Sequence, residues 1–234
     1  MKIEREILSL GICIGASTIS FVKMAKDIGG NIISVKQYSH EGNPKSLLKK
    51  FFEENNYERY SVVVTGRKFK NLINAFVIPE PKAIENSLKY LGYTGKKMAI
   101  ASLGAENFMV YCVNERGTLE NVMTGNKCAS GTGEFFLQQI SRMNISVDEA
   151  VSISDNDNPY SVSGRCSVFC KSDCTHALNK GVPMPNVVSG LGKMIADKTV
   201  ELLAKQKYKK VLLIGGVSKN KSVCPTCFSH LCIA

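Results

Sequence analysis

The sequence predicts an α/β protein made of two similar halves. Two stretches, residues 7–38 and 98–123, share one order of features: an apolar strand, a turn of glycine and small residues, a return strand and a third strand. Helical patterns with apolar residues on one side follow both stretches. A duplicated meander of this kind predicts two α/β halves that face one another, with their glycine turns pointing into the cleft between them.

Prolines and glycines mark the boundaries in the first half. Pro44 opens a helix, and Pro79-Glu80-Pro81 is the clearest break in the chain. The expected elements are two strands within 7–24 joined by a turn at 11–18, a third strand over 32–38, a helix over 45–55, a strand over 62–64 and a helix over 83–91.

The second half repeats the meander and continues into helices. Its glycine turn is Gly104–Asn107, and a pair of glycines, Gly215-Gly216, follows the last apolar strand. Small residues at such turns let a phosphate approach the backbone. The expected elements are strands over 98–103, 108–113 and 119–123, helices over 135–143, 147–153 and 184–205, and a strand over 211–214.

Composition indicates a globular protein in a reducing compartment. The 234 residues are 44% apolar, which suffices for a sizeable core, and no stretch reaches the ~18 to 20 apolar residues of a membrane span. We therefore expect a cytoplasmic protein without a membrane partner. Nine cysteines, an odd number, predict metal or redox chemistry rather than a disulfide framework. The net charge of +10 comes from scattered lysines without a nucleic-acid motif, so we expect no nucleic-acid partner.

Two cysteines stand at predicted helix entrances. Cys128 lies within Asn126–Glu134, directly before an apolar-periodic segment. Cys166 lies within a second entrance, Ser163–Cys174, in which Cys170 and Cys174 follow it at intervals of four. Free N–H groups and the positive end of a helix dipole stabilise anions, so a phosphate and a thiolate are both favoured there. The alternative for each cysteine is a buried, purely structural role.

Several of these segments resemble motifs of one family, the activator ATPases of 2-hydroxyacyl-CoA dehydratases and benzoyl-CoA reductases, within the sugar kinase, Hsp70 and actin superfamily. Lys127–Gly133 is similar to the family's K-C-A-[AS]-G-T-G, Cys166–Phe169 to its C-[ST]-V-F, and Gly215–Asn220 to its G-G-V-x-x-N. The resemblance covers nearly the whole chain. It implies two ribonuclease H-like (actin- and Hsp70-like) halves with a nucleotide cleft between them, over residues 1–92 and 93–234.

The resemblance also implies a function. Members are ATP-dependent one-electron donors to a dehydratase- or reductase-type iron–sulfur protein that acts on an acyl-CoA. In them, two equivalent cysteines from each subunit of a homodimer hold one [4Fe–4S] cluster, so Cys128 and Cys166 inherit that role. The implied cofactors are ATP or ADP, Mg²⁺ and the cluster. The implied nucleotide contacts are Gly15, Ala16, Ser17, Thr18, Gly104, Ala105, Asn107, Gly131, Thr132, Gly133, Gly215, Gly216 and Asn220.

Both phosphate turns depart from the family pattern by lacking carboxylates. The first usually reads G-[IV]-D-[IV]-G-S-T, and here Cys13 holds the acidic position. The second usually reads D-[IV]-G-G-Q-D, and here its acidic positions are Ser102 and Asn107. Glu106 is then the nearest catalytic candidate to orient water or Mg²⁺. Because phosphoryl transfer needs such carboxylates, we expect nucleotide binding with slow hydrolysis.

Other functions stay open at this stage. One is a non-hydrolysing docking or relay domain that keeps the dimer and the cluster. Another is a sugar or acyl kinase of the same superfamily, which the paired cysteine entrances disfavour. The spacing of Cys224 and Cys227 suits zinc or thiol exchange in principle, although one such pair with one histidine is too little for a closed zinc site. Compared with the family, the second half is expected to lack its closing helix, and Cys170 and Cys174 are expected to support the cluster rather than bind it.

Overall fold

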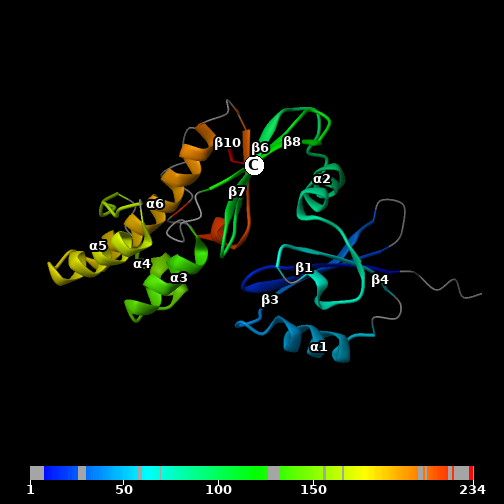
Figure 1. The fold of residues 1–234 in the computed structure, drawn as a ribbon, viewed down its shortest axis with the longest axis horizontal. Coiled ribbons are helices and arrows are strands. Elements are labelled where there is room, and N and C mark those ends of the chain that lie inside the picture. The colour runs from blue at the N-terminus through cyan, green and yellow to red at the C-terminus, as the bar shows by residue number, and fades with distance from the viewer. Residues whose placement is uncertain are drawn as a thin grey trace, which may run out of the picture. The chain divides into compact units, whose positions relative to one another are not determined.

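The computed structural model describes residues 8–25, 30–56, 60–68, 70–125, 132–154, 157–164, 166–204, 208, 210–220, 223 and 232–233. The chain divides into two compact units, Met1–Tyr90 and Leu91–Ala234, and Figure 1 shows that each contains its own sheet and helices. Within the described ranges, no helix is long and apolar enough to cross a membrane.

The first unit is built on a five-stranded sheet of order β3-β2-β1-β4-β5. Strands β1, β2 and β3 form the predicted antiparallel meander, while β4 and β5 run parallel to β1. The elements are β1 (Leu8–Ile14), β2 (Thr18–Met24), β3 (Ile32–Ser39), α1 (Pro44–Glu54), β4 (Tyr60–Gly66), η2 (Lys70–Leu72), β5 (Phe76–Val77) and α2 (Glu80–Tyr90).

Helix α1 closes the core of the first unit. The side chain of Asn43 accepts a hydrogen bond from the backbone N–H of Ser46 at 3.1 Å, and Pro44 occupies the first helical position, where no N–H is needed. The apolar side of α1 then packs on the sheet, where Phe51 stacks on Phe21 with ring centroids 3.7 Å apart.

The second unit repeats this sheet with the order β10-β9-β6-β7-β8. Strands β6, β7 and β8 form an antiparallel meander, and β9 and β10 run parallel to β6. The elements are β6 (Met98–Leu103), β7 (Phe108–Val113), β8 (Leu119–Thr124), α3 (Gly133–Arg142), α4 (Val147–Ile153), α5 (Ser167–Asn179), α6 (Met184–Ala204), β9 (Lys210–Ile214), η4 (Gly216–Lys219) and β10 (Cys232–Ile233). Every residue of β6 is buried.

The duplicated meander predicted from the sequence is confirmed, and the larger differences in detail lie in the first turn, helix α2 and two short strands. The first turn is shorter than 11–18, because β1 continues to Ile14. Helix α2 begins at Glu80 rather than at residue 83, because Pro81 fits the first turn of a helix, where its missing N–H is not needed. The short strands β5 and β10 were not predicted, since two residues carry no periodic signal.

A glycine at the end of one parallel strand is required in each unit. Gly66 ends β4 at φ +130°, and a Cβ atom there would overlap the carbonyl group of Ile14 on β1. Gly215 follows β9 at φ +95°, and a Cβ atom there would overlap the carbonyl group of Leu103 on β6. L-residues with a side chain are disfavoured at such φ values as well.

Replacing Gly66 by alanine is therefore expected to destabilise the fold by about 3 kcal/mol, from positive φ and overpacking together. Gly181→Ala is the matched control, because Gly181 has φ +78° but nothing within 4 Å of the added Cβ. Its free energy of unfolding should fall by only about 1 kcal/mol. Urea unfolding of both variants measures the difference, and equal losses would show that the contact with Ile14 is unimportant.

Candidate functional site

The two units carry the same tight turn between the first two strands of their meanders. In the first, the N–H of Gly15 donates to the carbonyl oxygen of Thr18 at 2.9 Å. In the second, the N–H of Gly104 donates to the carbonyl oxygen of Asn107 at 3.0 Å. Each turn follows the carboxyl end of a strand that is paired in parallel on its other side, which is the edge where α/β sheets bind ligands.

Helix α3 begins directly on the second turn. The N–H of Gly133 donates to the carbonyl oxygen of Gly104 at 3.1 Å, and that of Glu134 to the carbonyl oxygen of Ala105 at 2.8 Å. The side chain of Thr132 caps the N–H of Phe135 at 3.3 Å. These three N–H groups at the helix entrance already have partners. Thr132 and Gly133 therefore dock α3 onto the turn, and their predicted contact with phosphate stays a prediction.

A third segment meets the same edge of the second sheet. Strand β9 pairs with β6 through Ile214 and Ser102, and the chain then turns through Gly215 into η4. A Cβ atom added to Gly133 would lie 2.7 Å from a methyl group of Val217 in η4, so α3 and η4 pack closely. A Cβ atom at Gly216 would meet nothing within 4 Å, which leaves this backbone open to a ligand.

The remaining predicted residues of this unit differ in their exposure, and their predicted contacts with a nucleotide stay predictions. Glu106 and Asn107 are exposed in the second turn, Ser102 is buried near the end of β6, and Asn220 is buried after η4. Cys128 and Gly131 lie outside the described residues, as do Cys224 and Cys227.

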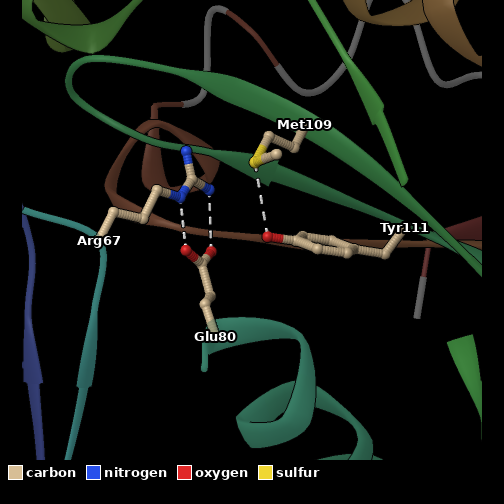
Figure 2. Close-up of polar contacts among 4 residues, drawn as sticks. All are labelled: Arg67, Glu80, Met109 and Tyr111. Atoms are coloured by element: carbon tan, nitrogen blue, oxygen red, sulfur yellow. Dashed lines mark hydrogen bonds and ion pairs between the residues drawn. The ribbon is translucent and has the colours of Figure 1, made fainter. Parts of the chain in front are cut away.

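The first unit contains a carboxylate near the first turn that sequence reasoning missed. Glu80, at the start of α2, binds the guanidinium group of Arg67 through both oxygens, at 2.5 and 2.9 Å (Figure 2). Arg67 directly follows β4, which pairs with β1 through Thr65 and Cys13. The sequence contains one weak signal for this pair: Arg67 directly follows a buried strand that ends in a glycine.

The charges of Glu80 and Arg67 both act on the pKa of the Cys13 thiol. Although part of Cys13 is exposed, neighbouring atoms remove some of the hydration around its sulfur, which raises the pKa of the thiol, and the negative charge of Glu80 raises it further. The positive charge of Arg67 opposes the shift but does not cancel it. Cys13 is therefore a neutral thiol at physiological pH, in the position where the family pattern has a carboxylate.

Cys166 is presented at the start of α5 in the second unit. It is the half-buried N-cap residue, and its side chain makes no capping hydrogen bond. The segment before it is tied to α5, because Asp173 accepts a hydrogen bond from the N–H of Ser163 at 2.8 Å. Val168 and Phe169 beside it are 69% and 63% exposed. Cys166 is therefore the partly accessible cysteine of this segment, and its predicted role as a cluster ligand stays a prediction.

Cys170 and Cys174 lie on the buried side of the same helix. Both belong to the hydrophobic core of the second unit, with exposures of 0% and 3%. Hydrogen bonding with Cys174 and burial both raise the pKa of the Cys170 thiol. Burial of both side chains in the core fits a structural role, and their predicted support of a cluster stays a prediction. Among the described residues, no three His, Cys, Asp or Glu side chains gather as a metal site.

The fold defines the class of protein. The structure is similar to that of the activator of 2-hydroxyisocaproyl-CoA dehydratase from Clostridium difficile with bound ADPNP, with a TM-score of 0.82 and 22% identity over 97% of this chain and 88% of that chain. A ROK family glucokinase from Streptomyces griseus shares the fold more distantly, with a TM-score of 0.52 and 11% identity over 95% and 88% of the two chains. The predicted fold class is confirmed: the chain has the two-part α/β fold of these activators and kinases.

Sequence comparison identifies the family. The chain belongs to the BadF/BadG/BcrA/BcrD ATPase family, whose model matches residues 10–227. The activator of lactoyl-CoA dehydratase from Anaerotignum propionicum is 25% identical over 224 residues, 92% of this chain and 85% of that protein. The 2-hydroxyisocaproyl-CoA dehydratase activator from Clostridioides difficile is 26% identical over 200 residues, 77% and 69% of the two. The predicted resemblance is thereby confirmed.

The electrostatic link between Glu80 and Cys13 makes a testable prediction. In Glu80→Gln the charge that raises the pKa of Cys13 is gone while Arg67 remains, so the pKa falls and more thiolate is present at neutral pH. Alkylation of Cys13 by iodoacetamide, followed by peptide mass spectrometry, should become faster by roughly threefold or more. Glu85→Gln, on the same helix, is the control and should change nothing. A slower reaction in Glu80→Gln would contradict the assignment.

Proposed function

We propose that this protein is an ATP-dependent activator that donates one electron to an iron–sulfur enzyme of the 2-hydroxyacyl-CoA dehydratase type. Its two ATPase halves, residues 1–92 and 93–234, bind the nucleotide, and a homodimer shares one [4Fe–4S] cluster. Membership of the ATPase family and the names of its relatives support the activator role. The observation that carries the proposal is the placement of Cys166, half-buried at the start of α5 between a buried core and an exposed apolar surface.

The cysteines of α5 support a ligand set drawn from more than one chain. Cys166 is accessible, whereas Cys170 and Cys174 are enclosed in the core and are not available to a cluster. A [4Fe–4S] cluster needs four thiolates, so two equivalent cysteines per subunit, Cys128 and Cys166, require a dimer. When bound, the cluster would supply the electron. The protein would hold it, with Val168 and Phe169 keeping water from its surroundings in the dimer.

The turns of the chain are suited to hold nucleotide phosphates. In the first unit, Ala16 and Ser17 form a tight turn of small residues. The hydroxyl oxygen of Thr65, opposite Cys13 on β4, is buried without a hydrogen-bond partner among the described residues, which supports a polar ligand at this edge. In the second unit, the open backbone at Gly216 offers a second place for close approach.

At the positions where the family pattern is acidic, the same turns lack carboxylates to hold Mg²⁺ and orient water. Cys13 is a neutral thiol, and Ser102 and Asn107 are uncharged. Glu80 is engaged by Arg67 through both oxygens. Glu106 is exposed in the second turn and is the carboxylate that we propose as the catalytic group. Because catalysis of phosphoryl transfer depends on positioned carboxylates, this activator should bind ATP but turn it over slowly.

We expect the protein to bind ATP and to hydrolyse it far more slowly than a relative with the full acidic set, since one missing group costs ~10²- to 10³-fold. Cys13→Asp with Ser102→Asp should raise hydrolysis and leave ATP affinity nearly unchanged. The control is Cys13→Asn with Ser102→Asn, because the asparagine side chain has nearly the shape of aspartate but carries no charge. Calorimetric titration and phosphate release measure both quantities, and fast hydrolysis by the parent would contradict the expectation.

The cluster proposal predicts about four irons per pair of chains in anaerobically purified protein, with a dimer in sedimentation. Cys166→Ser should lose the iron and its visible absorption. Cys170→Ser is the matched control on the same helix and should retain both, because its sulfur lies in the core. A monomer with full iron content, or iron loss in the control alone, would reject the assignment.

The docking or relay module is the alternative that the missing carboxylates favour. It would show the dimer, the iron and nucleotide binding, but no phosphate release under any condition. A kinase of the same superfamily would instead transfer phosphate from ATP to a sugar or an acid and contain no iron. The measurements above therefore separate the three functions.

A further inference from the structure

His40 is a buried histidine beside the first turn that none of the site residues above includes. It directly follows β3, and only 4% of it is exposed. Its Nε2 atom lies 3.4 Å from the carbonyl oxygen of Gly15, which opens the turn. Its backbone N–H donates to the carbonyl oxygen of Ser17 at 3.1 Å. His40 is thus hydrogen-bonded to the carbonyl groups of both Gly15 and Ser17, the first and third residues of the turn.

The hydrogen bonds of the ring fix its tautomer. The N–H of Gly42 donates to Nδ1 of His40 at 3.2 Å, so Nδ1 acts as an acceptor and carries no proton. In the neutral ring the proton is then on Nε2, and Nε2–H donates to the carbonyl oxygen of Gly15. The ring is held from one side by Gly42 and itself holds Gly15 on the other.

A tight turn brings Gly42 back to the ring. The N–H of Asn43 donates to the carbonyl oxygen of His40 at 2.6 Å, and Glu41 and Gly42 between them have φ values of +47° and +82°. Positive φ at both central residues is the pattern of a type I′ turn. Asn43 then caps α1, so the ring of His40 is positioned by a turn that is anchored to a helix.

Holding these two carbonyl groups orients the N–H groups of the turn. In a trans peptide the C=O and the following N–H point in opposite directions, and no cis bond occurs among the described residues. Because Gly15 and Ser17 direct their oxygen atoms at His40, the N–H groups of Ala16 and Thr18 point away from it. Both belong to the turn that the proposed function assigns to phosphate.

The geometry points to His40 as a positioning residue that keeps the first turn in its phosphate-binding form. This inference rests on the proposed nucleotide function and adds to it. The imidazole does not touch phosphate; it acts through the peptide between Gly15 and Ala16. Loss of the imidazole should therefore weaken the binding of a nucleotide more when the turn holds more of its phosphates. Recognition of the nucleoside should stay unchanged.

Two substitutions of His40 test the hydrogen bonds of its two ring nitrogens separately. Asn places its oxygen near the position of Nδ1, so His40→Asn keeps the bond from Gly42 but does not reach Gly15. Gln carries an N–H donor near the position of Nε2, so His40→Gln keeps the bond to Gly15. His176→Asn is the control, because His176 is exposed on α5 of the other unit.

Calorimetric titration with ATP and with AMP tests the assignment. His40→Asn should bind ATP about five- to tenfold more weakly, the effect of losing one hydrogen bond, while AMP affinity changes less than twofold. His40→Gln and His176→Asn should match the parent for both ligands. Unchanged ATP binding in His40→Asn, or equal loss for ATP and AMP, would overturn the inference. Absence of ATP binding by the parent would instead reject the proposed function, and this inference with it.

A measurement on the parent protein keeps the inference testable if His40→Asn does not fold. Nitrogen-15 NMR of the histidine rings distinguishes the tautomers. We expect His40 to carry its proton on Nε2 in the free protein, and the resonance of that nitrogen to shift when ATP is added but not when AMP is added. A proton on Nδ1, or a resonance that ATP leaves in place, would overturn the assignment.

Discussion

In both units, a glycine at the end of a parallel strand lies against a backbone carbonyl group of the neighbouring strand, and the turns depend on this contact. Gly66 lies against Ile14, and Gly215 against Leu103. Both carbonyl residues directly precede a turn glycine, Gly15 or Gly104 in the sequence. Since any side chain would overlap the carbonyl group, the strand and the turn come together only when glycine is present. The duplication therefore preserves a backbone contact as well as a strand order.

Much of this fold was predictable, because its elements are short, periodic and separated by glycine or proline. Strands β6 and β7 and helix α4 have the predicted bounds. The error at β1 has a physical cause. Gly11 and Cys13 read as part of a turn, yet they continue a strand because β2 and β4 pair with it on both sides. Tertiary pairing overrides the local preference of small residues for turns.

The segments expected to form the site exist as turns at the sheet edges, but the side-chain partners around them were not predicted. Arg67 and Glu80 are 13 residues apart, and His40 and Gly15 are 25 apart. No local pattern links such positions; they meet because β4 lies beside β1 and β3 returns beside β2. The rule that helix N-termini present free N–H groups also has a limit here. At α3, the N–H groups of Gly133 and Glu134 donate to carbonyl oxygens of the second turn. These donors, which the sequence analysis assigned to a ligand, therefore already have partners within the protein.

In the proposed function, the electrostatics of the turns separate nucleotide binding from turnover. Around the first turn, Cys13 is neutral and Arg67 balances the charge of Glu80, so these three described residues present no uncompensated negative charge to a triphosphate. The same absence removes a ligand for Mg²⁺, on which phosphate release depends. A nucleotide shifts a conformational equilibrium by its difference in affinity for the two states, and it does so whether or not it is cleaved. In the proposed function, which passes an electron while ATP is bound, tight binding with slow cleavage would prolong the active state, and cleavage would then serve to reset it.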